Sequence, residues 1–411
     1  MSDLIQPRVL KGFRDFLPKA QIQRATLQEK ITEVYRSFGF VPIDTPVLEY
    51  TEILLRKSNG ETEKQVFRFE DNGGRDVAMR FDLTVPFARF TAEHFAELYL
   101  PFKRYHISKV WRGEKPQAGR YREFVQCDVD TVGSDSAVSD FEILNVMKAA
   151  LNAIGVEKIT IHVNHRGIFN RFLNKLGLLE KSEDILRSVD KLAKIGEEEV
   201  KKELLEYSGD EAKASEILKY ISAKGSFLEI LSQLETMAGG PDTDTQRMKD
   251  IYEMMKASGI ESTYVLDPSI TRGLDYYTGV VYETFLNDLP SIGSVCSGGR
   301  YDNLAGLEQL GITENKGSYV DAEIFCQDAS DIVAYQKTAT LLRAKGVNVE
   351  VFPDAKKMNQ QYKVTEAKSI AWGILISKDQ IANNTLTLKN LKTREMFEGI
   401  TVEKACELIQ S

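Results

Sequence analysis

The sequence predicts an α+β domain with an antiparallel sheet, interrupted by a helical insertion and followed by a smaller α/β domain. Three observations predict this class. Two long strand patterns at 102–114 and 123–132 are joined by a polar loop; a stretch rich in Leu, Lys and Glu and nearly free of Pro covers 168–260; and strand and helix patterns alternate from residue 319 onward. A chain of 411 residues is too long for one compact core and fits two or three domains.

The first predicted element is a helix over residues 21–38, where apolar side chains recur near helical spacing until Gly39 ends the run. The residues that follow, 40–48, are expected to be extended. Pro42 and Pro46 exclude a helix there, and they suit a strand that lies at an edge or an interface.

A β-hairpin is predicted over residues 65–81, just before the two long strands. Its two strand patterns are separated by a short polar segment that contains Asn72, Gly73 and Gly74. We expect these three residues to supply the positive φ that a tight turn needs, because Gly and Asn adopt it at the lowest steric cost.

A helix is predicted over residues 135–154, with Ser134 or Asp135 near its N-cap. It closes the first part of the main domain, and the helical insertion then separates this part from a second one in which strand and turn signals return. The expected bounds are 1–167 and 261–307 for the two parts of the main domain, 168–260 for the helical insertion, 308–318 for a linker and 319–411 for the tail domain.

The tail domain is predicted to alternate strands and helices, the pattern that is typical of a small α/β fold. Apolar runs bounded by polar residues mark its strands, and longer mixed stretches mark its helices. The expected strands cover 322–326, 347–352, 370–376 and 385–388, and the expected helices cover 331–345, a stretch before residue 370, and the segment from residue 402.

Composition places the chain among ordinary globular proteins: 42% of its residues are hydrophobic, 28% are charged, and the net charge is −8. These values exclude a wholly disordered or low-complexity chain. They also exclude a surface that is basic overall, of the kind that binds nucleic acid. No apolar run approaches the roughly 20 residues of a membrane-spanning helix, so we expect no membrane association. The four cysteines are scattered without a CxxC pair, which favours free thiols in the reducing cytoplasm.

The two long strands are each expected to carry one polar face, because side chains alternate along a strand. If the strands pair, these faces form a platform that suits a nucleotide: Arg112 can bind a phosphate, Phe124 can stack on a base, and Arg120 in the joining loop can clamp the distal phosphates. Cross-strand ion pairs on a solvated face would produce the same pattern. The platform residues are Arg112 and Glu114 on the first strand, and Phe124, Gln126, Asp128 and Asp130 on the second.

Two later stretches, 271–279 and 297–303, combine glycines with aromatic and basic residues. Their glycines allow backbone or ligand to approach closely, but neither stretch matches a Walker A or Rossmann fingerprint. Taken singly, each is typical of a turn that carries surface tyrosines. The donors and rings that these stretches contribute are Arg272, Tyr276, Tyr277, Arg300 and Tyr301.

At this point the residues resemble a known family. Residues 102–133, with Trp-Arg-Gly-Glu at 111–114, resemble motif 2 of the class II aminoacyl-tRNA synthetases. Residues 38–46 resemble motif 1, whose proline lies at a dimer interface. The resemblance therefore implies a class II synthetase-like catalytic domain and a homodimer formed through the region around Pro46.

Two further motifs resemble the histidine-specific motifs of the histidyl-tRNA synthetase family. They are Arg-Gly-Leu-Asp-Tyr-Tyr at 272–277 and Gly-Gly-Arg-Tyr-Asp at 298–302. Residues 11–18 fit the N-terminus of that family, and residues 386–391 fit its C-terminal anticodon-binding domain. The resemblance covers nearly the whole chain, and the motifs together are far more specific than any one of them.

The resemblance implies ATP-dependent activation of histidine and its transfer to tRNA(His). The histidine carboxylate would attack the α-phosphorus in line, with Arg112 and Arg272 neutralising charge there and Mg²⁺ on the released pyrophosphate. The amino group of histidine would be held by Asp82, Thr84 and Gln126. The residues implied for the histidine side chain are Asp130, Tyr276, Tyr277 and Tyr301, and those implied for ATP are Arg112, Glu114, Arg120 and Phe124.

The sequence departs from the family pattern after residue 303. The family continues into motif 3, a glycine-rich strand that ends in Gly-Leu-x-Arg and whose arginine stacks over the adenine. Here the chain contains no arginine between Arg300 and Arg343, so roughly a strand and half a helix are expected to be missing. A chain that truly lacks this segment should bind ATP poorly and form adenylate slowly.

Three other interpretations remain open. A non-catalytic paralogue, such as the synthetase-like regulatory subunit of ATP phosphoribosyltransferase, would explain the missing motif 3, although such paralogues usually lose more motifs. A class II synthetase for another amino acid is disfavoured by residues 272–277. His162 and His165 could form a metal pair, but no third ligand is evident and structural roles are favoured.

Overall fold

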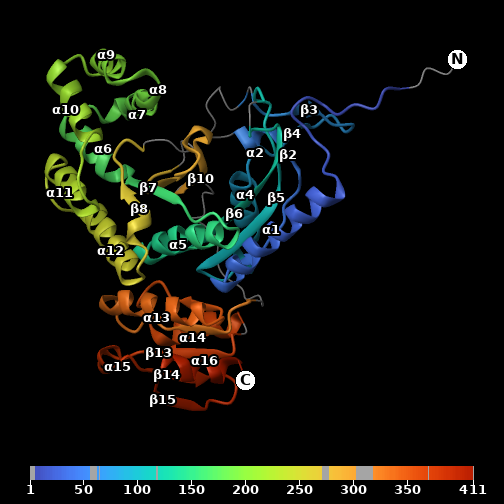
Figure 1. Cartoon of the computed structure of the whole chain (residues 1–411), viewed down its shortest axis with the longest axis vertical. Coiled ribbons are helices and arrows are strands. Elements are labelled where there is room, and N and C mark those ends of the chain that lie inside the picture. Colours follow the sequence, from blue (N-terminus) through green and yellow to red (C-terminus); the bar gives the residue numbers. More distant parts are fainter. Residues whose placement is uncertain are drawn as a thin grey trace.

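The computed structural model describes residues 5–55, 63, 65–116, 119–270, 277–301, 318–368 and 370–410. Figure 1 shows a central body, a group of helices on one side of it and a compact C-terminal domain below. The body begins with the elements α1 (Pro18–Ser37), β1 (Val41–Pro42), β2 (Leu48–Tyr50), α2 (Thr51–Leu55), β3 (Arg68–Glu70), β4 (Asp76–Met79), α4 (Thr84–His94), β5 (Phe102–Trp111), β6 (Glu123–Val132) and α5 (Ala137–Ala153).

The two long predicted strands do pair. β5 and β6 are antiparallel over ten residues each, from Phe102 opposite Val132 to Trp111 opposite Glu123. β1 adds a short parallel strand at the edge of β5, so the body contains a mixed sheet in the order β1-β5-β6. This pairing confirms the antiparallel core that the strand patterns predict.

The hairpin of β3 and β4 forms where it is predicted, but its turn uses one positive φ instead of three. Gly74 alone adopts it, at +74°, whereas Asn72 and Gly73 do not. The Asp71 carboxylate stabilises the turn instead. It accepts hydrogen bonds from the backbone N–H groups of Gly73 (2.8 Å) and Arg75 (2.9 Å).

Helix α5 begins two residues later than the predicted start, and its N-cap is Ser136. The Ser136 hydroxyl accepts a hydrogen bond from the Val138 N–H at 3.2 Å, which satisfies one of the free donors in the first turn. Ser134, one of the two expected caps, instead accepts the N–H of Ser136 at 3.3 Å. The helix packs against α1 on one side and α12 on another.

A four-stranded sheet in the order β10-β9-β7-β8 forms the other half of the body, and seven helices lie between β7 and β8 in sequence. These elements are β7 (Ile159–His165), α6 (Arg166–Lys175), α7 (Ser182–Asp190), α8 (Leu192–Ile195), α9 (Glu197–Ser208), α10 (Glu211–Ile221), α11 (Phe227–Met237), α12 (Thr243–Ala257), β8 (Tyr264–Leu266), β9 (Val280–Leu286) and β10 (Ser294–Gly299).

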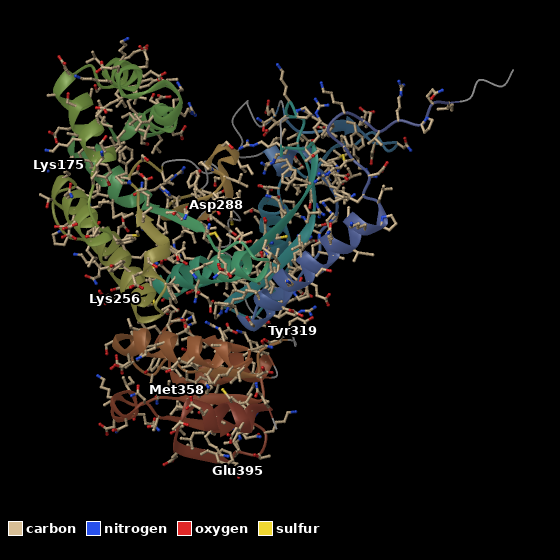
Figure 2. The ribbon with its side chains drawn as sticks, viewed as in Figure 1. Lys175, Lys256, Asp288, Tyr319, Met358 and Glu395 are labelled. Carbon is tan, nitrogen blue, oxygen red and sulfur yellow. The ribbon has the colours of Figure 1, made fainter. Side chains whose placement is uncertain are left out.

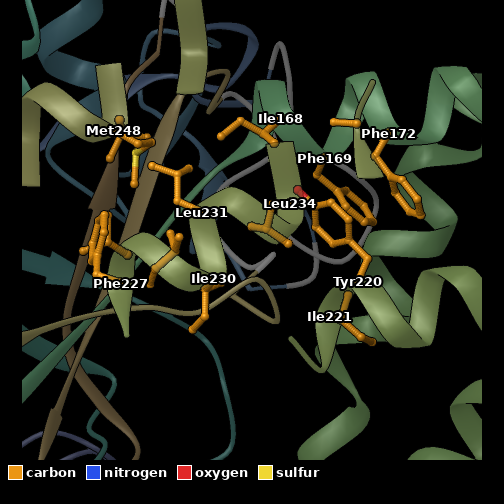
Figure 3. Packing of buried hydrophobic residues seen from close by; sticks show 14 of the residues in the cluster. Ile168, Phe169, Phe172, Tyr220, Ile221, Phe227, Ile230, Leu231, Leu234 and Met248 are labelled. Carbon is orange, nitrogen blue, oxygen red and sulfur yellow. The ribbon is translucent and has the colours of Figure 1, made fainter. Parts of the chain in front are cut away.

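These helices share one hydrophobic core with the sheet and with α5, so they do not enclose a separate interior. Figure 3 shows Phe172 of α6 beside Tyr220 of α10, and their rings stack with centroids 4.5 Å apart. Leu231 and Leu234 of α11 extend the same cluster and are fully buried. The continuous core ties the helices to β7, and it therefore helps to hold the body as one unit.

The tail domain alternates strands and helices as predicted, around a five-stranded sheet in the order β12-β11-β13-β14-β15. The sequence patterns missed the edge strand β15 and the short helix α15. Its elements are β11 (Ala322–Ile324), α13 (Ile332–Ala344), β12 (Val349–Val351), α14 (Met358–Ala367), β13 (Trp372–Leu375), α15 (Lys378–Asn383), β14 (Leu386–Asn390), β15 (Met396–Ile400) and α16 (Val402–Gln410).

Among the described residues, no helix is both long enough and apolar enough to cross a membrane. The longest helix, α1, runs for 20 residues but carries Lys, Arg and Glu along its length. The linker predicted over 308–318 lies outside the described residues except for Ser318.

Removing a buried leucine from α11 tests the shared core. Leu234→Ala should lower the free energy of unfolding by about 2–5 kcal/mol, because Leu234 is 0% exposed and its truncation leaves a cavity. Leu228→Ala is the matched control, since Leu228 lies on the same helix at 43% exposure and should change stability by roughly 0.5 kcal/mol or less. Urea unfolding of both variants makes the measurement, and equal losses would contradict the shared core.

Candidate active site

The paired strands β5 and β6 separate an apolar face from a polar one. Tyr105 and Val129 lie on the apolar face, which packs against α1 and α5. The opposite face brings Arg104 across from Asp130 and Ser108 across from Gln126. The polar face that strand alternation predicts therefore exists along β5 and β6. The first strand is shorter than predicted: β5 ends at Trp111, so Arg112 and Glu114 follow the strand and are not part of it.

Asp130 is the centre of this polar face. Its Oδ2 lies 2.5 Å from Nη2 of Arg104, and its Oδ1 accepts a hydrogen bond from the Tyr301 hydroxyl at 2.6 Å. Arg104 is fully buried, and its guanidinium lies 4.1 Å from the centre of the Phe87 ring. Burial raises the pKa of Asp130, whereas Arg104 and the Tyr301 hydroxyl counteract this effect.

Sequence reasoning missed Arg104. The signal that could have found it is the register: once Val110 and Phe124 are placed opposite each other, counting along both strands puts Arg104 opposite Asp130. A buried guanidinium needs a counter-ion, so this pair is the strongest electrostatic contact that holds the two strands together at this end.

Asp82 and Gln126 present acceptor atoms that have no partner among the described residues. Asp82 is 2% exposed; its Oδ1 accepts the Val85 N–H at 3.1 Å, and its Oδ2 is buried without a hydrogen bond. The Gln126 Oε1 is likewise buried without a partner. Burial raises the pKa of Asp82 to about 6. Unpaired buried acceptors are costly, so these two atoms are positioned to accept donors from a ligand.

The carboxylates of Asp82, Asp128 and Asp130 share one electrostatic environment with two arginines. Burial raises the pKa of Asp128 to about 7; Arg104 and Arg112 lower it, and the other two carboxylates raise it. Groups that influence one another in this way lie in the same site. Asp128, which the strand alternation places on the platform, therefore belongs to this cluster as well.

Arg112 lies at the open end of the platform. Its Nε donates to the Phe81 carbonyl at 3.0 Å, and its guanidinium lies 5.2 Å from the centre of the Phe124 ring. Glu114 is half-buried, and its carbonyl accepts the Nε of Arg122 at 2.9 Å. This arrangement leaves a half-buried cation beside an aromatic face.

Arg120 lies in the loop between β5 and β6 and is exposed. The end of this loop is anchored by the N-terminal segment, since the Arg122 N–H donates to the Gly12 carbonyl at 2.8 Å. Thr84 is the first residue of α4 and is half-buried, two residues after Asp82 in sequence.

The two predicted tyrosines that fall within the described residues lie together. The rings of Tyr277 and Tyr301 have centroids 6.4 Å apart at an angle of 45°. A side chain at Gly299 would place its Cβ 2.9 Å from Cδ1 of Tyr277, so glycine is required there. Arg272 and Tyr276 lie outside the described residues.

Arg300 has a structural role. Its Nε donates to Oδ1 of Asp140 at 2.9 Å, and its carbonyl accepts the Thr278 N–H at 2.8 Å. It thereby fixes the chain just before Tyr301. A cavity of about 220 Å³ opens beside Asp130 and Tyr301, between α4, α5 and the two sheets.

His162 and His165 do not form a metal pair. The His162 Nδ1 lies 2.7 Å from Asp267 Oδ2, and the His165 Nδ1 accepts the Gly167 N–H as the N-cap of α6. Among the described residues, no group of three or more His, Cys, Asp or Glu side chains could hold a metal ion.

An antiparallel platform with a buried carboxylate–arginine pair, a half-buried arginine over an aromatic ring and a separate C-terminal α/β domain defines a class II aminoacyl-tRNA synthetase fold. Residues 12–313 match the family model described as histidyl-tRNA synthetase, and residues 325–411 match the one described as anticodon binding domain. The chain belongs to the histidyl-tRNA synthetase family.

The chain is similar to the histidine–tRNA ligase of Treponema denticola, with 61% identity over 92% of this chain and 91% of the relative. The alignment with this relative has 407 positions, but the 92% of this chain that it covers supplies fewer residues than that. Some positions of the relative therefore have no counterpart in this chain. The crystal structure of histidyl-tRNA synthetase from Nostoc is 26% identical, covers 99% of both chains and has a TM-score of 0.67.

A second solved structure shows the fold alone. It is described as an ATP phosphoribosyltransferase regulatory subunit/histidyl-tRNA synthetase from Bacillus halodurans, and it is 22% identical with a TM-score of 0.66. It covers 91% of this chain and 99% of its own. The same architecture therefore extends to a protein whose description includes a regulatory role, and fold alone does not separate the two functions.

The buried Asp82 carboxylate gives a pH-dependent prediction. Its pKa lies above the ordinary 3.8, at about 6, so the folded chain binds more protons than the unfolded chain and loses stability as pH rises from about 4 to 6. Asp82→Asn lacks this loss. We expect the variant to be more stable than the parent at pH 7, by up to about 3 kcal/mol, and the difference to vanish below about pH 4.

Asp71→Asn is the control of opposite sign. Hydrogen bonds from Arg75 lower the pKa of Asp71 to about 2, so its ionised form stabilises the fold above pH 4 and this effect is lost as pH falls toward 2. Asp71→Asn should therefore be less stable than the parent at pH 7. Urea unfolding across this pH range measures both variants, and an Asp82→Asn variant that is less stable at pH 7 would contradict the assigned pKa.

Proposed function

We propose that this chain activates histidine with ATP to form histidyl-adenylate and then transfers the histidyl group to tRNA(His). The observation that carries the proposal is the grouping of charges beside the polar face: Arg112 donates to the Phe81 carbonyl, next to Asp82, and both side chains act electrostatically on Asp128. This grouping joins a phosphate-binding cation to carboxylates suited to a cationic amino acid. Membership of the histidyl-tRNA synthetase family and 61% identity to a histidine–tRNA ligase support the same assignment.

The histidine would lie along the polar face with its two ends in different surroundings. Asp82 Oδ2 and Gln126 Oε1 are the unpartnered acceptors that would receive its ammonium N–H groups, and Thr84 is proposed as a third contact. Asp130, with Tyr301 and Tyr277 next to it, would accept the imidazole N–H. Tyr276, implied for the same pocket, lies outside the described residues. The carboxylate of histidine would then point toward Arg112.

ATP would bind at the open end of the platform. Phe124 would stack on the adenine and Glu114 would bind its edge, while Arg112 would bind the α-phosphate and Arg120 the β- and γ-phosphates. Mg²⁺ would arrive with the phosphates of ATP and leave with pyrophosphate. The attack by the histidine carboxylate needs no protein nucleophile, because alignment and charge neutralisation lower the barrier. Arg272 is proposed as the second cation at the α-phosphate.

The tail domain is proposed to bind the anticodon of tRNA(His), in keeping with its family match over 325–411. A homodimer through the motif 1 region is supported by exposed apolar side chains near Pro46, among them Leu48 at 43% and Tyr50 at 48%. We place the protein in the cytoplasm, where its substrates ATP and tRNA are found and where its free cysteines stay reduced.

Pyrophosphate exchange with each amino acid tests the proposed function. Histidine should be the one amino acid that supports exchange. Exchange with a different amino acid would favour a class II synthetase for that amino acid, and a lack of exchange with every amino acid would favour a non-catalytic paralogue. We further infer that the reaction is slower, with a higher KM for ATP, than that of the Treponema denticola relative, because no arginine stands between Arg300 and Arg343 to cover the adenine. Equal rates in a chain of verified sequence and mass would refute this inference.

Arg112 tests the ATP half of the site. Arg112→Ala should lower kcat for adenylation by about 10²–10³-fold, since its guanidinium stabilises charge that develops at the phosphate. Lys109→Ala is the matched control: Lys109 lies on β5, three residues before Arg112, and its exposed side chain pairs with Glu123 at 2.9 Å. Single-turnover adenylation of both variants makes the comparison, and similar rates would contradict the role of Arg112.

Asp130 and Tyr301 test the histidine half. Tyr301→Phe removes one donor to Asp130 and keeps the ion pair with Arg104, so it should raise KM for histidine by roughly ten-fold with little change in kcat. Asp130→Ala should raise KM further, but it also leaves Arg104 without its counter-ion and should destabilise the fold by about 3–5 kcal/mol. A KM for histidine that is unchanged in both variants would contradict the imidazole pocket.

A further inference from the structure

A buried cluster of charges joins the tail domain to the catalytic body. Figure 1 shows α13 and α14 of the tail domain directly beneath α5 and the lower end of β5, and Tyr319 lies at the same junction in Figure 2. Six charged side chains from both sides meet there, and all have at most 8% of their side chain or residue surface exposed. They are Lys103, Glu142, Glu323, Arg343, Glu350 and Lys368.

The contacts form a continuous chain across the junction. Lys103 of β5 lies 2.7 Å from Glu142 of α5 and 3.9 Å from Glu350 of β12. Glu350 in turn accepts two hydrogen bonds of 2.8 Å from Lys368. Arg343 of α13 lies 3.4 Å from Glu142. Every buried cation therefore has a carboxylate, and two of these carboxylates contact side chains from both domains.

The backbones also approach closely at this junction. Gly39 has a φ of +83°, and a Cβ there would lie 2.6 Å from Val320 Cγ2 and 3.1 Å from Glu350 Oε2. The guanidinium of Arg343 lies 4.1 Å from the centre of the Phe38 ring. These contacts are those of a packed interior rather than of two modules joined by a mobile linker, so the tail domain is seated on the body in one defined position.

Two elements connect the charge cluster directly to the histidine site. On β5, Lys103 faces the tail domain and the next residue, Arg104, faces the platform and binds Asp130. On α5, Glu142 faces the cluster, while Asp140, two residues earlier on another side of the helix, holds Arg300 next to Tyr301. Arg104 on β5 and Asp140 on α5 hold the two sides of the proposed histidine pocket. Each of these elements also carries a residue of the charge cluster.

We propose that Lys103 and Glu142 are positioning residues, through which the tail domain, by its residues Glu350 and Arg343, sets the geometry of the histidine pocket. Displacing the Glu350 carboxylate removes one of the two carboxylates that neutralise the buried Lys103, which shifts the lower end of β5, and Arg104 and Asp130 move with it. The tail domain thereby influences the affinity for histidine even when tRNA is absent. This inference rests on the proposed function, since it assigns the pocket to histidine.

Glu350→Gln in the full chain tests the proposal by steady-state adenylation without tRNA. KM for histidine should rise about five-fold or more, the lower range of coupling between two sites, while KM for ATP and kcat change less. Glu366→Gln is the matched control, because Glu366 lies in the same domain in an exposed pair with Arg394 and should change neither KM. A KM for histidine within about two-fold of the parent in Glu350→Gln would overturn the proposal.

A double variant separates positioning from stability. Glu350→Gln alone leaves Lys368 buried without its counter-ion, which destabilises the chain; Glu350→Gln with Lys368→Met removes both charges and should recover much of that stability. Under the proposal, KM for histidine stays raised in the double variant, because Lys103 keeps Glu142 but still lacks the Glu350 carboxylate of the tail domain. A KM that returns to the parent value together with the stability would show a purely structural role and overturn the proposal.

Hydrogen exchange gives a readout that does not depend on activity. Backbone amides of β5 and β6 near Arg104 and Asp130 should exchange faster in Glu350→Gln than in Glu366→Gln, and equal protection would overturn the coupling. If the parent chain fails to support histidine-dependent exchange of pyrophosphate, the proposed function is wrong, whereas this comparison still decides whether the tail domain controls the pocket.

Discussion

The ion pair between Arg104 and Asp130 is the contact on which the organisation of the site depends. Arg104 is fully buried, and two of its guanidinium nitrogens have no partner among the described residues, so loss of Asp130 would remove the carboxylate that contacts it directly. The pair locks β5 and β6 in one register. Tyr301, which follows β10, donates to the same carboxylate and thereby brings the second sheet against the first. One buried charge thus joins the two halves of the body where a ligand must bind.

The site is assembled at the expense of stability. Asp82 and Gln126 hold acceptor atoms that are buried without donors, and Asp82 and Asp130 lie close enough to Asp128 to raise its pKa. Such an arrangement is unfavourable in the free protein, and under the proposed function a bound amino acid supplies the missing donors. The energy that holds these groups in place comes from elsewhere, mainly from the continuous core of helices and sheet shown in Figure 3.

The tail domain packs against the catalytic body through buried charged side chains. Its buried carboxylate Glu350 faces Lys103, which is adjacent in sequence to Arg104, and the alternation of side chains along β5 turns these two cations toward opposite partners. Strand β5 therefore contacts the pocket through one face and the tail domain through the other. A protein that must read a nucleic acid at one end and an amino acid at the other can use this arrangement to link the two events.

Local patterns in the sequence determined the elements: the pairing of the long strands, the helices between β7 and β8 and the alternation of the tail were all predicted, because periodicity and turn residues act over short distances. The same patterns placed Gln126 and Asp130 on one face. They missed Arg104, the Ser136 cap, β15 and the contact between Arg300 and Asp140, and they overstated the need for Asn72 and Gly73 in a turn that Asp71 holds. Only the tertiary structure decided these features, because burial, register and the choice of counter-ion arise from residues that are distant in the chain.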